Sequence, residues 1–141
     1  MLLIGEKILL TLWVGGMWTV GYIVAPTLFN MLEKAVAGNV AGQLFTVISY
    51  LGLVCGTLLI IGATSRLGSQ VIYSWVFWVI VVMIIIVLIG QFILQPMMAE
   101  LKAVGITDLN RSDFGKLHGV ASVLFLINSI LGLALVIGQN R

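Results

Sequence analysis

Four long apolar runs, separated by short stretches that carry most of the charge, limit what this chain can form more than any other feature. The runs cover about residues 8–29, 43–64, 74–98 and 114–139. A helix needs roughly 20 apolar residues to cross about 30 Å of hydrocarbon, and each run reaches that length. Because backbone amides find no water partner in lipid, each run must form a helix. We therefore predict an all-α integral membrane protein, a four-helix antiparallel bundle that forms a single membrane domain over residues 1–141.

The composition excludes several other classes of protein. Of the 141 residues, 61% are hydrophobic and only 9% are charged, whereas a soluble domain has about a quarter of its residues charged. A chain with so few charged side chains cannot cover the surface of a soluble enzyme. The basic residues are scattered and the net charge is only +2, which argues against a nucleic-acid partner. With one cysteine, the chain forms no intrachain disulfide and no structural zinc site.

The stretches outside the runs indicate how the chain enters and leaves the membrane. The first run is too long for a cleaved signal, so we expect a retained helix. Residues 30–42 alternate apolar and charged side chains, which predicts a short interfacial helix. An even number of spans places both termini on one side, and the two sides differ by one basic residue. Because four of the five acidic residues lie on the opposite side, we expect the termini in the cytoplasm.

Small residues predict which helices touch, since close packing rather than the hydrophobic effect joins helices in lipid. Gly52 and Gly56 form a GxxxG pair in the second run, and Gly115 and Gly119 form another in the fourth. The third run has no glycine, alanine or serine over residues 75–89. We therefore expect spans 1, 2 and 4 to form the tight core. Span 3 then faces lipid or a second copy in a homo-oligomer.

Polar side chains inside the spans are the candidate functional residues, because hydrocarbon penalises an unpaired polar group. On the last span, His118, Ser122 and Ser129 fall within about 40° of one another, with Asn128 at the margin of this face. This polar face predicts either a contact with another helix or the wall of a permeation path.

A second group of polar residues lies at the end of the third run. Gln91 and Gln95 are one turn apart, just before Pro96. Antiparallel packing brings the end of span 3 beside the start of span 4, so His118 is expected at a similar depth. The glutamines suit either interhelical hydrogen bonds or ligand contacts.

The chemistry of these residues leaves two interpretations open. His118 is the only histidine, and it suits either a hydrogen bond to a neighbouring helix or contact with haem, porphyrin or quinone. Trp18 and Tyr22, one turn apart, either pack in the core or form a wall against which a haem, porphyrin or quinone ring stacks. A lone histidine predicts no metal site, and no pattern predicts catalytic residues, so we do not expect an enzyme. The candidate binding residues are Trp18, Tyr22, Gln91, Gln95, His118, Ser122 and Asn128.

Three motifs carry a resemblance to a known family. They are Leu12-Trp13-Val14-Gly15-Gly16-Met17 with Gly21-Tyr22-Ile23-Val24-Ala25-Pro26-Thr27-Leu28-Phe29, Gln95-Pro96-Met97-Met98, and Phe114-Gly115-Lys116-Leu117-His118-Gly119-Val120-Ala121-Ser122 with Asn128. In these the chain resembles a family of small four-helix bacterial membrane proteins, domain of unknown function 4149, related to eukaryotic drug-resistance-associated transmembrane proteins. The resemblance implies four spans and the bacterial inner (cytoplasmic) membrane, and it implies no reaction.

Three functions are compatible with this pattern. The first is a non-catalytic accessory or scaffold protein that binds a partner helix, and so a partner membrane protein, or membrane lipid. The second is a membrane redox protein that holds haem, porphyrin or quinone through His118. The third is an oligomeric transport or permeation unit, in which the polar face of the last span lines the path.

Overall fold

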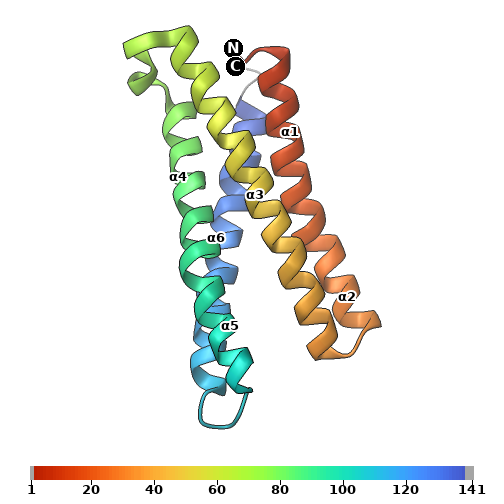
Figure 1. Ribbon diagram of the computed structural model, residues 1–141. Helices are drawn as coiled ribbons and strands as arrows, with labels where there is room; N and C mark the ends of the chain where they lie inside the picture. The colour runs from red at the N-terminus through yellow and green to blue at the C-terminus, as the bar shows by residue number, and fades with distance from the viewer. Residues whose placement is uncertain (1, 139–141) are drawn as a thin grey trace.

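Four long helical segments run alternately up and down the molecule (Figure 1). The computed structural model describes residues 2–138. The four segments that are long and apolar enough to cross a membrane are Ile4–Met31, Lys34–Tyr73, Trp75–Val104 and Arg111–Gly138. The prediction of an all-α, four-helix membrane protein is confirmed.

The elements follow one another with short connections. They are α1 (Ile4–Thr19), η1 (Val20–Val24), α2 (Ala25–Met31), α3 (Lys34–Leu67), η2 (Gly68–Tyr73), α4 (Trp75–Ile89), η3 (Gly90–Leu94), α5 (Gln95–Val104) and α6 (Arg111–Gly138). The interfacial helix expected over residues 30–42 is wrong, because α3 begins at Lys34 and continues without interruption through that stretch. The predicted end of the last span at residue 139 lies outside the described residues.

A wider π turn precedes each proline of the chain. In η1 the N–H of Ala25 donates to the carbonyl of Val20, five residues back, and Pro26 follows. Proline has no N–H, and its ring clashes with the carbonyl four residues earlier in a regular α-helix. The π turn changes the hydrogen-bond register there, so the span continues through the proline.

The same arrangement recurs in the third span. In η3 the N–H of Gln95 donates to the carbonyl of Gly90, and Pro96 follows. The fold therefore consists of two similar hairpins. Each has a first span interrupted by a π turn and proline, and a long second helix, which is α3 in hairpin 1 and α6 in hairpin 2.

The hairpins pack as a square, in which α1 and α4 each contact both α3 and α6. The expectation that spans 1, 2 and 4 form the core without span 3 is wrong, because α4 lies between α3 and α6. Ile80 and Met83 of α4 are buried in the core. Much of the rest of α4 nevertheless faces outward, and only 11% of the most apolar 18-residue stretch of the third span is buried, against 22–33% in the other spans.

We call the half of the bundle nearer the termini, where all four spans pack together, the closed half. Its core depends on Trp13. Its ring lies over Gly52 and Gly56 of α3, and a Cβ added at Gly56 would lie 3.0 Å from the ring and 2.9 Å from Ile84. This confirms close packing at the first GxxxG pair. The second pair does not pack, because Cβ atoms at Gly115 and Gly119 would meet nothing within 4 Å.

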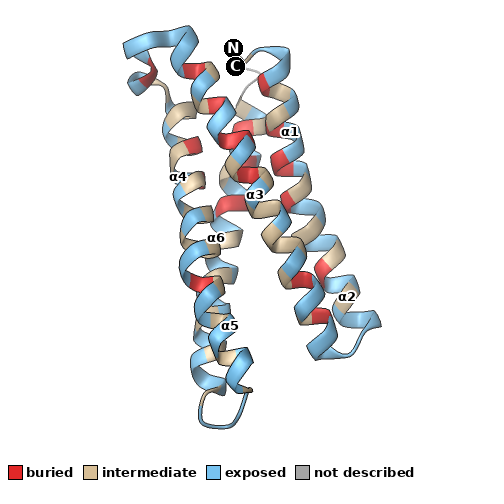
Figure 2. Ribbon diagram, in the orientation of Figure 1, coloured by how far each residue is buried: buried red, intermediate tan, exposed pale blue. Residues whose placement is uncertain are grey.

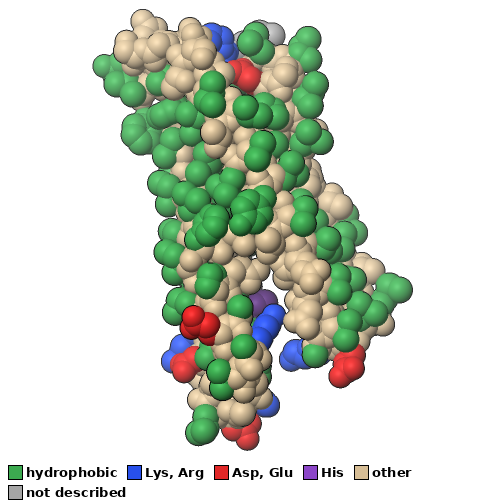
Figure 3. All heavy atoms as spheres, in the orientation of Figure 1, with side chains coloured by type: hydrophobic (Ala, Val, Ile, Leu, Met, Phe, Trp, Pro, Cys, Tyr) green, Lys and Arg blue, Asp and Glu red, His purple; other side chains and the backbone are tan. Residues whose placement is uncertain are grey.

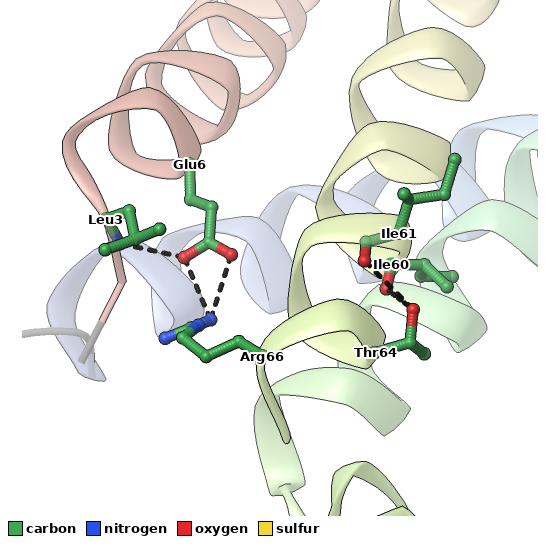
Figure 4. A network of polar contacts seen from close by, with 6 residues as sticks. All are labelled: Leu3, Glu6, Ile60, Ile61, Thr64 and Arg66. Carbon is green, nitrogen blue, oxygen red and sulfur yellow. Dashed lines mark hydrogen bonds and ion pairs between the residues drawn. The ribbon is translucent and has the colours of Figure 1, made fainter. Parts of the chain in front are cut away.

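An ion pair fastens the end of the closed half (Figure 4). Arg66 Nη2 of α3 donates to both carboxylate oxygens of Glu6 in α1, at 2.9 and 3.0 Å. The N–H of Leu3 also donates to Glu6, at 2.8 Å. A Cβ at Gly62 would lie 2.8 Å from the carboxylate, so this glycine leaves the space that Glu6 fills. The Glu6 side chain is buried although it stands three residues into its helix.

We expect Gly56→Leu to destabilise the bundle by about 1–3 kcal/mol, because the larger side chain must displace Trp13 and Ile84. Thermal unfolding in mild detergent measures the effect. Gly15→Leu is the matched control, since Gly15 is exposed on α1 and a Cβ there meets nothing. Equal unfolding temperatures for the two variants would contradict this account of the core.

We expect Arg66→Met to cost about 3 kcal/mol of stability, because it leaves the buried Glu6 carboxylate without its cation. Adding Glu6→Gln to that variant should restore most of the loss, since both charges are then absent. Arg111→Met is the control, because its ion pair with Asp108 is fully exposed at 3.7 Å. A double variant as unstable as Arg66→Met alone would show that the ion pair is not the cause.

Candidate functional site

The two hairpins separate in the half of the molecule that lies away from the termini (Figures 1 and 2). Here α2 packs against α3 and α5 packs against α6. Figure 3 shows a hollow between the two hairpins, with basic and histidine side chains at its edge. We call this region the open half.

A cleft of about 500 Å³ occupies the open half between α3 and the end of the third span. The α3 wall consists of Gly38, Asn39, Gly42, Gln43 and Thr46. The opposite wall, from η3 and α5, consists of Gln91, Gln95, Pro96, Ala99 and Lys102. Glycine and alanine on both walls keep the space open, and a Cβ at Gly42 would meet nothing within 4 Å.

The lining of the cleft includes several polar side chains and no acidic group. Four primary amides, those of Asn39, Gln43, Gln91 and Gln95, line it together with one ammonium group. Gln91 Oε1 is buried and has no hydrogen-bond partner. A buried acceptor without a partner is uncommon in folded proteins and costs free energy.

Lys102 supplies the only charge on the lining. Its Nζ lies 5.7 Å from the centre of the Phe114 ring at the start of α6. Phe114 in turn stacks on His118, with the ring centres 6.3 Å apart. The Lys102 ammonium thus lies near an aromatic ring. It forms no salt bridge with a carboxylate among residues 2–138.

Aromatic rings join the hairpins where the open half meets the closed half. Tyr22 of η1 lies 5.8 Å from Phe125 of α6, and Phe92 of η3 lies 6.2 Å from Tyr50 of α3. Each π turn thus places a ring on the long helix of the other hairpin. Phe45 meets Phe125 edge-on at 5.2 Å between them.

Trp18 and Tyr22 lie in this aromatic group rather than on the cleft lining. Their ring centres are 4.9 Å apart, and Trp18 Nε1 donates to the carbonyl of Ser129 at 3.2 Å. Gly21 makes room for the Phe125 ring beside them. The pair therefore has packing partners on α6, while 38–40% of each residue stays exposed.

The structure brings Gln91 and Gln95 together on the cleft and places His118 nearby but off the lining. His118 stands two turns before Phe125 on α6, so it projects from the same face about 10 Å lower. It is exposed, and its ring contact is the stack on Phe114. No hydrogen bond from its ring to a neighbouring helix occurs among residues 2–138.

The polar face predicted on the last span divides into two parts. Ser122 and Ser129 donate to carbonyls of their own helix, those of His118 and Phe125. Ser122 is exposed, whereas Asn128 is buried and its Nδ2 lies 3.6 Å from Met17 Sδ. Asn128 Oδ1 has no partner. The buried part belongs to the core and the exposed part to the open half.

The α3 wall was missed by the sequence analysis. Asn39, Gln43 and Thr46 lie in a stretch that we had expected to be interfacial or barely inside the membrane. The signal was present, because Asn39 and Gln43 are one turn apart and Gly38 and Gly42 repeat the same spacing beside them.

We expect His118→Ala to change stability by less than about 0.5 kcal/mol, because the side chain is exposed and makes no hydrogen bond between helices. Thermal unfolding in detergent measures this, with Phe114→Ala as the comparison for the stacked partner. A large loss of stability for His118→Ala would show that the histidine does join helices.

Comparison with known proteins identifies the family but no individual relative. No curated protein and no solved structure matches the chain significantly. The family model described as "Domain of unknown function (DUF4149)" matches residues 8–107. The match includes both walls of the cleft and ends before α6, so His118 and Asn128 lie outside it. With a match over most of its length, this multi-pass membrane protein belongs to the DUF4149 family.

Proposed function

We propose that the chain is a non-catalytic membrane protein that binds the polar part of a lipid in the cleft of its open half. The position of the cleft between two neighbouring spans is the observation that carries the proposal. Its walls belong to spans 2 and 3, which are neighbours in the square and pack together along the closed half. A gap between neighbouring spans opens sideways, toward surrounding lipid.

Pockets for small ligands commonly measure about 300–1,000 Å³, and the cleft of about 500 Å³ falls in that range. The amides and the ammonium of its lining suit the polar part of a lipid.

The closed half argues against a path across the membrane. The polar lining ends at Thr46 and Gln91. Beyond it, Trp13, Leu59 and Met83 fill the centre of the bundle and are almost fully buried. A permeation pathway within one copy would have to pass through this core.

The redox alternative has less support from the geometry. His118 is exposed and lies off the cleft lining. The Trp18 ring, which would form the wall of a cofactor site, is engaged with Tyr22 and with the carbonyl of Ser129. A haem or quinone site would require these residues to rearrange.

We further propose the bacterial inner membrane with both termini in the cytoplasm, which follows the family resemblance and the excess of acidic residues at the other end. Homo-oligomerisation through the outward face of α4 is compatible with lipid binding, because the cleft opens beside α5 rather than on that face.

We expect Gly42→Leu to remove co-purified lipid, because Gly42 lines the cleft and an added Cβ there meets no atom within 4 Å, so the leucine is accommodated and takes up space in the cleft. Native mass spectrometry of protein released from mild detergent measures both the lipid retained and the number of subunits. The wild-type chain should retain about one lipid per subunit, and Gly42→Leu should retain at least about tenfold less.

Gly15→Leu is the matched control, since it adds the same side chain to an exposed position of α1 away from the cleft. Retention by this variant should equal that of the wild type. Retention that is unchanged in Gly42→Leu, or a wild-type chain that carries no lipid when purified and when supplied with native lipid extract, would refute the proposal.

A further inference from the structure

We infer that a second copy of this chain docks on the outward face of α6, so that two copies form a parallel dimer about a two-fold axis. The docking surface is a groove of about 370 Å³ whose lining residues all belong to α6. They are Lys116, Gly119, Val120, Val123 and Leu124. The groove shares no residue with the cleft. The inference therefore goes beyond the proposed lipid binding, and either one can fail without the other.

The glycine pair of α6 has no packing role within one copy. A Cβ added at Gly115 or Gly119 would meet nothing within 4 Å. Gly132 of the same helix differs, because a Cβ there would lie 2.9 Å from Val14 of α1. Glycine within a helix is less favourable than alanine, so the stability of one copy does not account for Gly115 and Gly119. Close approach of a helix from outside the bundle accounts for both.

The groove faces away from the bundle and continues along α6. At 100° per residue, the lining residues centre about 150° around the helix from the core-facing Gly132. Val120 and Val123 are 50% and 57% exposed. Ile127 and Ile130 lie on the same side and are also exposed, so the apolar face extends about 16 Å from the glycine pair. A second helix can therefore lie along this face for about three turns.

Charges at the outer end of the groove are complementary to themselves under two-fold symmetry. Asp113 and Lys116 are both exposed, and neither forms a salt bridge among residues 2–138. They lie about 60° apart around α6 and about 4.5 Å apart along it. Two copies inserted in the same direction are related by an axis along the membrane normal, so their α6 helices run parallel at the same height. Asp113 of each copy then lies beside Lys116 of the other.

This charge pair favours a second copy over the other occupants of an apolar groove. A lipid phosphate attracted by Lys116 would be repelled by Asp113, and an acyl chain would leave both charges unpaired. The outward face of α4 is a weaker candidate for close helix contact, because residues 75–89 include no glycine, alanine or serine.

The first test is the number of subunits in protein released from mild detergent, measured by native mass spectrometry. We expect the wild type to be mainly dimeric and Gly119→Leu to contain at least about tenfold less dimer, because the leucine fills the groove. Gly15→Leu is the matched control on an exposed part of α1 and should dimerise as the wild type does. Helical content and lipid retained in the cleft should be unchanged in Gly119→Leu, which shows that the variant folds.

Exchange of the two charges tests the register of the dimer. Asp113→Lys and Lys116→Asp should each lower the dimer fraction about three- to tenfold, because each places like charges together. The double variant should restore the dimer, since the pair is then reversed but intact. Glu100→Lys is the control for charge, because Glu100 is exposed on α5 and lines neither the groove nor the cleft. A double variant that stays monomeric would overturn the reciprocal pairing.

Oxidative cross-linking with copper phenanthroline tests the contact in native membranes. Val123→Cys should form a disulfide between copies, whereas Val82→Cys, on the outward face of α4, should not. Cys55 is buried and does not compete.

Three results would overturn the inference. They are a wild type that is monomeric by both methods, a dimer insensitive to Gly119→Leu, and cross-linking through Val82→Cys instead of Val123→Cys. A monomer that carries a lipid lost in Gly119→Leu would also overturn it, because lipid would then occupy the groove. Loss or survival of lipid in Gly42→Leu bears on the proposed function alone.

Discussion

The insertion of Trp13 between α1 and the glycine pair of α3 is the interaction on which the rest of the bundle depends. In lipid the hydrophobic effect does not hold helices together, so the close fit of a large ring against Gly52 and Gly56 must do so. Ile84 of α4 reaches the same gap, which draws the third span against α3. The closed half is thus fixed by van der Waals contact around one ring. The open half has no equivalent, since an added Cβ at Gly42, nearly three turns before Gly52, would meet no neighbour.

The prolines connect this difference in packing to the backbone. Each one forces a π turn at the level where the hairpins begin to separate, and each π turn carries an aromatic ring, Tyr22 or Phe92, that contacts the other hairpin. Two of the contacts between the hairpins at this level are therefore made by residues whose direction is set by a local change in helical register, beside the contact of Phe45 with Phe125. Beyond them α2 and α5 each follow their own hairpin partner. The cleft follows from this geometry and needs no side chain to hold it open.

The sequence predicts the helices well because the number of spans depends on length and hydropathy alone. The third span is rich in Val and Ile, which favour strands in water, but backbone amides in lipid require a helix there too. The sequence predicts poorly which helices are in contact, because a glycine shows only that space is available and not which side chain fills it. Gly52 and Gly119 each belong to a GxxxG pair, yet Gly52 is covered by Trp13 and Gly119 is open. Glu6 looks like an interfacial charge until Arg66, sixty residues later, is seen to face it. Gln91 and Gln95 could be found as a pair, whereas the wall that faces them depended on where α3 begins.

The energetics of the open half link its occupant to the stability of the fold. A buried unpaired carbonyl costs about 1–3 kcal/mol. Four primary amides line the cleft, and the Oε1 atom of one of them, Gln91, is buried without a partner. A molecule that binds in the cleft binds the folded protein and not the unfolded chain, so it must raise the free energy of unfolding as its concentration rises. On the proposed function, lipid therefore stabilises the fold at the half where the two hairpins pack least.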